Sequence, residues 1–285
     1  MTYTTLVGTE QLARHLSDPD WVIVDCRFSL AEPESGRLAY REAHIPGAVY
    51  AHLNEDLSSP VVPGVTGRHP LPTIDRAVHT FSSWGIDDRT QVVAYDDWGS
   101  GGGASAARLW WLLRWLGHKA VAVLDGGWGK WLSEKRPVRE SIEYRRAHEF
   151  IPRLQPEMLA SIRDVDAMRN DPQARVLDSR APERYRGEVE PLDTVAGRIP
   201  GAQSAPYAEN LGPDGKLLPV EALRKRFQAL IGNVQVKNVV FYCGSGVTAA
   251  YNVLALAHAG LGDARLYNGS WSEWITNPNR PIARG

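Results

Sequence analysis

Cysteine is scarce in this sequence, because only Cys26 and Cys243 occur among its 285 residues. Two cysteines cannot supply the disulfide framework of a small secreted protein, and neither a Cys-x-x-Cys motif nor a Cys/His metal spacing occurs. We therefore expect no metal, and no residue pattern indicates an organic cofactor. A reducing cytoplasm, where thiols stay free, is the compartment that this cysteine content favours.

The sequence also lacks an excess of charge and any long apolar run. It has 32 basic and 33 acidic residues, so no basic surface for nucleic acid or for an anionic membrane is expected. No stretch is long enough to span a bilayer, and the first residues lack the basic and apolar regions of a secretory signal. We expect no nucleic-acid partner and no membrane association.

What the sequence does contain is one chemically distinctive stretch. A run of β-branched and aromatic residues at 239–242 predicts a buried strand, and an Ala- and Leu-rich run at 249–256 predicts a helix. Cys243 begins the Cys-Gly-Ser-Gly-Val-Thr loop between them. The first amides of a helix have no intrahelical partner, and glycines allow a loop backbone to turn its N–H groups toward one point. These donors and the helix dipole would stabilise a thiolate there.

Several functions are compatible with a cysteine in this loop. It could be an ordinary buried cysteine. A P-loop requires Gly-Lys-Ser/Thr where this loop has Gly-Val-Thr. A cysteine phosphatase or an arsenate-reducing relative requires an arginine directly after the loop to hold phosphate oxygens, and Ala249 stands there. We favour a nucleophilic thiolate that carries a small group such as a sulfane sulfur, with a sulfur-carrier module that lacks turnover as a further alternative.

The two halves of the chain repeat the same motifs in the same order, which indicates a tandem duplication. Strands that alternate with helices predict, for each half, an α/β domain with a mostly parallel sheet and helices on both faces. We expect one domain at 1–137 and the other at 153–285, joined by a charged linker at 138–152. The main matches are Asp25-Cys26-Arg27 with Asp178-Ser179-Arg180, His44-Ile45-Pro46-Gly47 with Arg198-Ile199-Pro200-Gly201, and Tyr95-Asp96 with Tyr242-Cys243.

The repeat predicts that only the second half is catalytic. Where that half has Cys243, the first half has Asp96, at the start of a glycine-rich loop at 96–103. An aspartate cannot accept and pass on a sulfur atom as a thiolate does. Cys26 aligns with Ser179 at a strand end, so we expect it to be structural. Because Arg27 recurs as Arg180, we expect both arginines, with the aspartates two residues before them, to be structural as well.

The Cys243-Gly-Ser-Gly-Val-Thr loop resembles the active loop of the rhodanese superfamily, and more narrowly that of the 3-mercaptopyruvate sulfurtransferases. With the duplication, the resemblance covers nearly the whole chain and implies two tandem rhodanese-like domains. It implies that a sulfane sulfur moves from 3-mercaptopyruvate, through a persulfide on Cys243, to a thiol, a thioredoxin-like protein or cyanide. Rhodaneses that use thiosulfate usually have charged residues after the cysteine, so thiosulfate is the alternative donor.

The resemblance also implies site residues. Arg184, in an Arg-x-Arg-Gly element, would bind the anionic end of the donor, with Arg186 as the fallback. Ser245 would act on the donor's carbonyl group together with His44, while no residue clearly matches the acid that completes this set in the family. The remaining loop residues, which would surround the donor and the persulfide, are Gly244, Gly246, Val247 and Thr248.

One departure from the family pattern concerns the donor. The relatives carry a second substrate arginine in a Glu-Pro-rich stretch, which here is 188–193 and contains no arginine. Arg198, which replaces the histidine of the repeated His-Ile-Pro-Gly turn, is the substitute that the sequence suggests.

Overall fold

The computed structural model describes residues 2–97 and 104–285, which form two compact units. The first unit contains Met1–Ser59 and Leu71–Gln155, and the second contains Pro60–Pro70 and Pro156–Gly285. The segment Pro60–Pro70 therefore belongs to the second unit although it lies in the first half of the sequence. Residues 98–103, in the glycine-rich loop expected after Asp96, lie outside the described residues.

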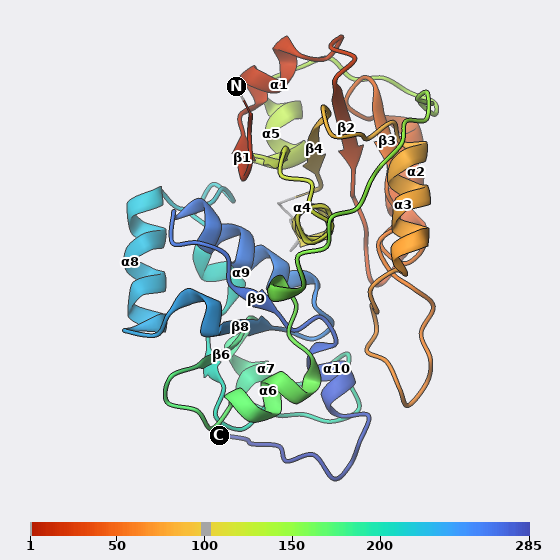
Figure 1. Ribbon diagram of the computed structural model, residues 1–285. Coiled ribbons are helices and arrows are strands. Elements are labelled where there is room, and N and C mark those ends of the chain that lie inside the picture. The colour runs from red at the N-terminus through yellow and green to blue at the C-terminus, as the bar shows by residue number, and fades with distance from the viewer. Residues whose placement is uncertain (1, 98–103) are drawn as a thin grey trace. The chain divides into compact units, whose positions relative to one another are not determined.

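The first unit is built on a parallel sheet with the strand order β1-β5-β4-β2-β3 (Figure 1). The central strands β2 and β4 consist entirely of buried residues, as expected for strands covered on both faces. The strands are β1 (Leu6–Val7), β2 (Trp21–Asp25), β3 (Ala48–Tyr50), β4 (Gln91–Tyr95) and β5 (Val121–Leu124).

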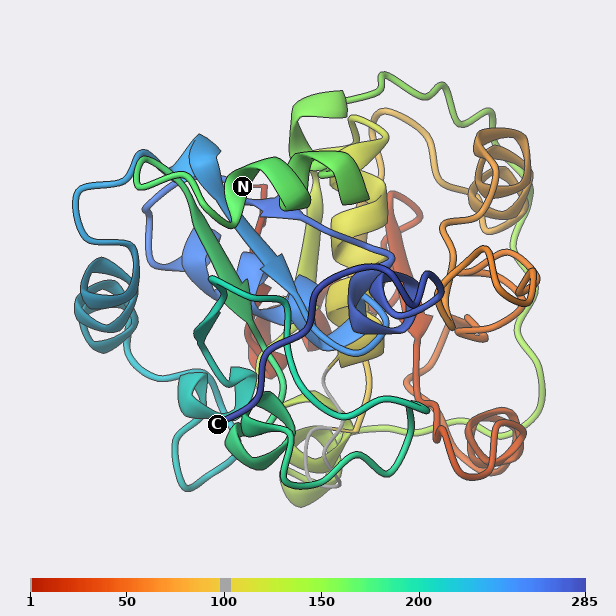
Figure 2. The same cartoon turned by 90° about the horizontal axis from the view of Figure 1, so that it is seen from below.

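The second unit repeats this arrangement with the parallel order β7-β6-β8-β9, and Figure 2 shows β6, in green, beside the blue β8. A bridge from Leu159 to Leu266 lies where β1 pairs with β5 in the first unit. The repeat therefore extends to strand order, and the expected tandem α/β architecture is confirmed. The strands are β6 (Arg175–Asp178), β7 (Gln203–Ser204), β8 (Val239–Tyr242) and β9 (Arg265–Leu266).

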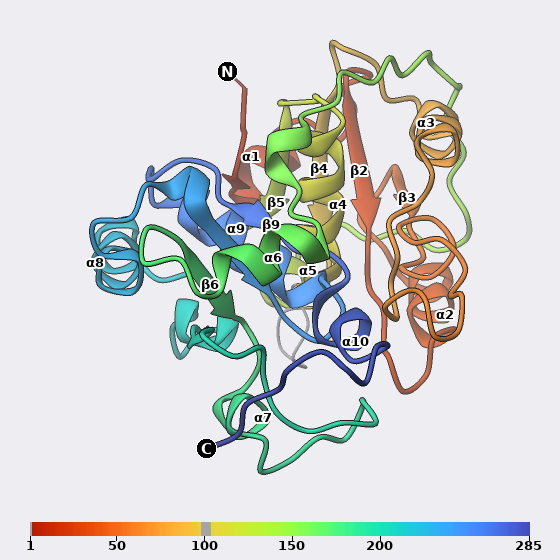
Figure 3. The same cartoon turned by 60° about the horizontal axis from the view of Figure 1, so that its bottom comes forward.

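Helices cover both faces of each sheet. In the second unit, α6 and α10 pack on one face, whereas α8 and α9 pack on the other and against each other (Figure 3). None of the described helices is long and apolar enough to cross a bilayer. The α-helices are α1 (Thr9–Arg14), α2 (Ser35–Glu42), α3 (Ile74–Ser83), α4 (Ala104–Trp115), α5 (Gly127–Ser133), α6 (Ile162–Met168), α7 (Pro182–Arg186), α8 (Val220–Ile231), α9 (Val247–His258) and α10 (Ser270–Trp274).

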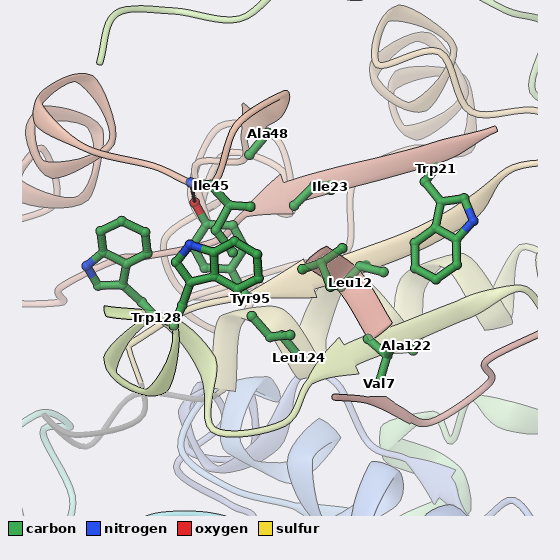
Figure 4. Close-up of a cluster of buried hydrophobic side chains, with 12 residues drawn as sticks. Val7, Leu12, Trp21, Ile23, Ile45, Ala48, Tyr95, Ala122, Leu124 and Trp128 are labelled. Atoms are coloured by element: carbon green, nitrogen blue, oxygen red, sulfur yellow. Dashed lines mark hydrogen bonds between the residues drawn. The ribbon is translucent and has the colours of Figure 1, made fainter. Parts of the chain in front are cut away.

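The cores follow the alternation of side chains along the strands. In the first unit, Ile23 and Tyr95 pack on one face of the sheet with Leu12 of α1 and Trp128 of α5 (Figure 4). In the second unit, the corresponding face packs Val176, Val240 and Tyr242 against two buried tryptophans of α10. These large apolar side chains fix the strand ends, and the polar residues that follow the strands are thereby held in defined positions.

An arginine–aspartate pair at the end of β2 recurs at the end of β6. The Arg27 guanidinium lies 2.6 Å from Asp25 and also donates to the Ala43 carbonyl. Arg180 lies 2.6 Å from Asp178 and donates to the Gly197 carbonyl. All four of these charged residues are buried. Because the same buried pair occurs in the half without the loop cysteine, these contacts support the prediction that it is structural.

Candidate active site

Cys243 follows directly after β8, at the carboxyl edge of a parallel sheet, where ligands bind in open α/β folds. Its Sγ accepts a hydrogen bond from the Gly246 N–H at 3.1 Å, and its own N–H donates to Ser270 Oγ at 3.0 Å. The residue is only 2% exposed. The sulfur is thus held beside an amide at the start of α9, a position that favours negative charge.

The two loop glycines are needed for different physical reasons. Gly246 has φ of +79°, in the left-handed region, and a Cβ there would also collide with the Asn268 carbonyl oxygen. Gly244 instead leaves space for cations: a Cβ at this position would lie 2.7 Å from Arg68 Nη2 and 3.4 Å from Arg184 Nη2. The loop therefore has one glycine for its backbone turn and one for the close approach of two guanidinium groups.

Residues 60–70, which we call the strap, bring two further side chains to this loop. The Arg68 N–H donates to Ser272 Oγ at 3.1 Å, and the Asn268 side-chain amide donates to the His69 carbonyl at 3.1 Å. These bonds hold the strap on the segment that leads from β9 into α10. The strap is therefore part of the second unit's site although it precedes that unit in the sequence by about ninety residues.

Ser245 is hydrogen-bonded to a histidine of the strap. His69 Nδ1 lies 2.8 Å from Ser245 Oγ, and both residues are buried. The sequence suggested His44 as this partner, but His44 lies in the core of the first unit. There its Nδ1 is 2.7 Å from the Tyr40 carbonyl, its ring stacks on Tyr40, and its Nε2 is 3.7 Å from Glu143. The histidine that the structure brings to Ser245 is His69.

Sequence reasoning overlooked His69, although a local signal was present. His69 stands in Gly67-Arg68-His69-Pro70, an irregular segment that is rich in proline and glycine. A polar residue held in such a loop is a better functional candidate than one in a core element. His44 attracted attention because of its His-Ile-Pro-Gly motif, which recurs with arginine in the second half and whose role is a turn of the fold.

Among the arginines that the sequence proposed, Arg184 is the one that lies against the loop. It extends from α7 to Gly244 and pairs with Glu190 at 2.6 Å and with Asp193 at 3.3 Å. Arg186 is exposed and pairs with Glu188. Arg198, the suggested substitute, donates to the Gly285 carbonyl at 2.6 Å and stacks on Tyr185.

Acidic side chains connect the arginines near the loop. Glu190 pairs with Arg184 and with Arg180, while Asp193 bridges Arg184 and Arg68. Burial acts to raise the pKa of Glu190, but the hydrogen bond and the charge of Arg184, together with the backbone N–H groups of Leu192 and Asp193, outweigh it and hold the pKa below its ordinary value. Burial raises the pKa of Asp193 above its ordinary value despite the nearby arginines. The result is a half-buried cluster of alternating charges beside the cysteine.

The remaining loop residues continue into the helix. Val247 and Thr248 are the first residues of α9, which begins two residues earlier than the sequence indicated. Val247 is buried and Thr248 is half-buried. Both therefore contribute backbone at the helix start, where amides are available to an anion.

Cys26, the second thiol, has a different environment. It is fully buried after β2, and burial, followed by the charges of Asp96 and Asp25, raises its pKa well above the ordinary value. Such a thiol stays protonated and is inert as a nucleophile. The expectation that Cys26 is structural agrees with this environment.

Comparison with known proteins gives consistent results. A family model described as rhodanese-like domain matches residues 8–134 and 161–277. A protein of Pseudomonas aeruginosa named "Probable 3-mercaptopyruvate sulfurtransferase" is 48% identical over 286 residues, which cover 100% of both chains. One of Mycobacterium tuberculosis named "Putative thiosulfate sulfurtransferase SseB" is 40% identical, over 98% of this chain and 97% of the relative. The solved 3-mercaptopyruvate sulfurtransferase from Leishmania major is 31% identical with a TM-score of 0.83, over 98% of this chain and 75% of that chain.

Proposed function

Since the chain belongs to the rhodanese family and is a sulfurtransferase, we propose that it takes sulfur from 3-mercaptopyruvate through a persulfide on Cys243. The observation that carries this proposal is the geometry of the loop. The Cys243 sulfur accepts a hydrogen bond from the Gly246 N–H, and Ser245 is hydrogen-bonded to His69. A sulfurtransferase needs a small-molecule donor and a thiol acceptor. We propose a thioredoxin-like protein as that acceptor and the cytoplasm as the compartment.

The first step is an attack of the Cys243 thiolate on the sulfur of the donor. The new S–S bond forms as the C–S bond breaks, and the electron pair of that bond goes to carbon, which leaves as the enolate of pyruvate. Ser245 donates a hydrogen bond to the enolate oxygen. The proton that the donor's thiol group loses is passed through His69 and Ser245 to that oxygen, and the resulting enol tautomerises to pyruvate. The loop amides stabilise the charge on the outer sulfur of the persulfide.

The second step returns the enzyme to its starting state. An acceptor thiolate attacks the outer sulfur of the persulfide, the S–S bond to Cys243 breaks, and its electron pair restores the Cys243 thiolate. Cyanide can attack the same outer sulfur in place of the thiolate, and it then leaves as thiocyanate. A single nucleophile and its helix amides are sufficient for both transfers.

The side chains around the thiolate divide into donor-binding and structural groups. We assign the donor's carboxylate to Arg184, because its guanidinium lies over Gly244, next to the nucleophile. His69 takes the role that the sequence suggested for His44. We assign no donor contact to Arg186 or Arg198, whose bonds are to Glu188 and to the chain end.

Thiosulfate is the second candidate donor, because one relative that is 40% identical carries that name. Its sulfonate-like end would use the same guanidinium group. Its leaving group, sulfite, is already a stable anion and, unlike the enolate of pyruvate, needs no proton. Ser245 and His69 would then be dispensable for sulfur uptake. Their presence as a buried, bonded pair favours mercaptopyruvate.

Steady-state turnover with each donor and cyanide, beside intact mass of the protein after donor exposure, tests this proposal. We expect a strong preference for mercaptopyruvate, and a gain of one sulfur atom that is lost in Cys243→Ser and kept in Cys26→Ser. If Cys243 gains no sulfur from either donor, the proposed reaction is wrong. Better use of thiosulfate would retain the persulfide but reject the assigned donor.

A further inference from the structure

We infer that Ser270 is a positioning residue for the nucleophile, and that its hydroxyl group fixes the backbone of Cys243 for the attack on sulfur. This inference rests on the proposed function, in which Cys243 carries the sulfur. Ser270 is the first residue of α10, and it is fully buried beside the cysteine loop. It acts through Cys243 and needs no contact with the donor.

The hydrogen bonds around Ser270 are the first argument. Its Oγ accepts the Cys243 N–H at 3.0 Å and donates to the Tyr267 carbonyl at 2.9 Å. The N–H of the next residue, Trp271, donates to the Cys243 carbonyl at 3.0 Å. Both backbone polar groups of the cysteine are therefore bound by the start of α10. Since they fix the backbone of Cys243, they also fix the direction in which its side chain leaves the chain.

The backbone of Ser270 is the second argument, because it has a conformation that disfavours serine. Its φ is +56°, in the left-handed region, where a Cβ atom crowds the backbone. Lys135 and Ser141 are the other non-glycine residues with positive φ in the part of the chain that the structure describes, and both are exposed. A buried serine in this conformation costs free energy that glycine would avoid, and such strain is concentrated at functional sites.

The first unit provides a control, because the same backbone conformation occurs there with glycine. Gly127 has φ of +54° and precedes Trp128, whose N–H donates to the Asp96 carbonyl at 3.0 Å. The turn and its backbone bond therefore form without a hydroxyl group at this position. Of the two units, only the one whose strand ends in the nucleophile has a serine here. The hydroxyl group thus serves the cysteine and not the turn.

The chemistry of the transfer explains why the backbone of Cys243 must be held. Attack on sulfur requires the cysteine sulfur, the donor sulfur and the carbon that leaves to lie in line, so a small displacement of Sγ slows the step. Sγ must also remain at the Gly246 N–H, 3.1 Å away. Without the Ser270 hydroxyl, the buried Cys243 N–H would lose its acceptor and this geometry would loosen. We expect the maximal rate of persulfide formation to suffer, and donor binding to be retained.

Two variants that remove the hydroxyl group separate its role from the strain of the backbone. Ser270→Gly also relieves the left-handed strain, whereas Ser270→Ala retains it. In single-turnover persulfide formation with mercaptopyruvate, both should lower the maximal rate about 10- to 100-fold, the effect of misplaced reacting atoms. The half-saturating donor concentration should change much less. The urea unfolding midpoint should be higher for Ser270→Gly than for Ser270→Ala, although the two rates fall alike.

Ser133→Ala is the matched control. Ser133 of α5 is exposed, and its hydroxyl group donates to the carbonyl three residues earlier, that of Lys130, at 2.9 Å. Ser270 makes the same kind of bond to Tyr267. The control therefore removes an equivalent hydroxyl group that has no cysteine bonded to it. It should keep both the maximal rate and the half-saturating concentration of the wild type.

Exchange of the Cys243 amide hydrogen with deuterium, followed by NMR, tests the bond without any turnover. This amide should exchange slowly in the wild type and in Ser133→Ala, and much faster in both Ser270 variants. The amides within β8 should keep their protection in all four proteins, because the sheet is not altered. A loss of protection throughout β8 would mean that Ser270 supports the fold in general, and the inference would be wrong.

The outcomes distinguish the inference from the proposed function. If the wild-type protein acquires sulfur but Ser270→Gly keeps its maximal rate, the inference is overturned and the proposed function stands. The inference also fails if the rates of the two variants follow their stabilities, or if only the half-saturating concentration rises. If the wild-type protein acquires no sulfur from either donor, the proposed function fails. Unchanged exchange of the Cys243 amide in Ser270→Gly would then reject the inference separately.

Discussion

The two units have the same kind of parallel sheet and the same buried arginine–aspartate pair, but they differ at the end of one strand. β4 and β8 both end in a buried tyrosine whose hydroxyl accepts the N–H of an isoleucine in a Pro-Gly turn, at 3.2 Å in each unit. The next residue is Asp96 in the first unit and Cys243 in the second. Asp96 accepts the Ala106 N–H near the start of α4 at 2.9 Å, whereas Cys243 accepts the Gly246 N–H at the start of α9.

This difference shows how a repeated scaffold is separated from its chemistry. Both residues place an acceptor at a helix start, where negative charge is favoured. A carboxylate in that position caps the helix, whereas a thiolate can also form and break a bond to sulfur. The surrounding cations differ too. Tyr40 and Tyr185 each donate to the alanine carbonyl of the repeated Pro-Gly turn, and the residue before the tyrosine is Ala39 in the first unit but Arg184 in the second.

The largest expected effect comes from an attempt to exchange the two units' roles. We expect Asp96→Cys, introduced into Cys243→Ser, to remain without measurable sulfur transfer. A thiol at residue 96 has Ala39 where the second unit has Arg184, the arginine that we propose for the donor, and Ser245 and His69 remain bonded to each other in the second unit. Turnover with mercaptopyruvate and cyanide measures this. Recovery of even a small part of wild-type activity would show that cysteine alone makes a rhodanese site.

The second effect compares the two histidines. His69→Gln should slow persulfide formation about 100- to 1,000-fold, because general acid–base groups contribute on that order. His44→Gln should instead lower the free energy of unfolding, since His44 is buried in the first unit and bonded to Tyr40. Single-turnover rates and urea unfolding of both variants give the comparison. A large rate loss in His44→Gln with normal stability would restore the role that its motif suggested.

The smallest effect concerns pH and the two thiols. The folded-state pKa of Cys26 is raised by burial, so its stabilising contribution is fully present below the unfolded-state pKa of about 8.5 and is lost above it. The stability advantage of the wild type over Cys26→Ala should therefore shrink above that pH, by at most about 1.4 kcal/mol per pH unit. Urea unfolding at several pH values from neutral to alkaline measures the gap. A gap that stays constant would mean that Cys26 is not protected from ionisation.

Much of the fold was determined by sequence patterns that act over short distances. The β-branched strand at 239–242, the glycine-flanked loop and the Ala-rich helix are adjacent in the chain, so their local preferences point to one structure. The duplication gave further information, because each half served as a control for the other. It predicted that Cys243 is the nucleophile, that the Asp25–Arg27 type of pair is structural, and that Cys26 is a residue of the fold.

Other features were decided only by the tertiary structure. Ser245 and His69 are 176 positions apart, and Arg68 meets Asp193 across 125 positions. No periodicity or motif encodes such a contact, because it depends on the folded path of residues 60–70 and on packing that closes a long loop. The sequence by itself determined the cysteine loop and the helix that follows it. The tertiary structure determined which histidine is bonded to Ser245 and which arginines lie against Gly244.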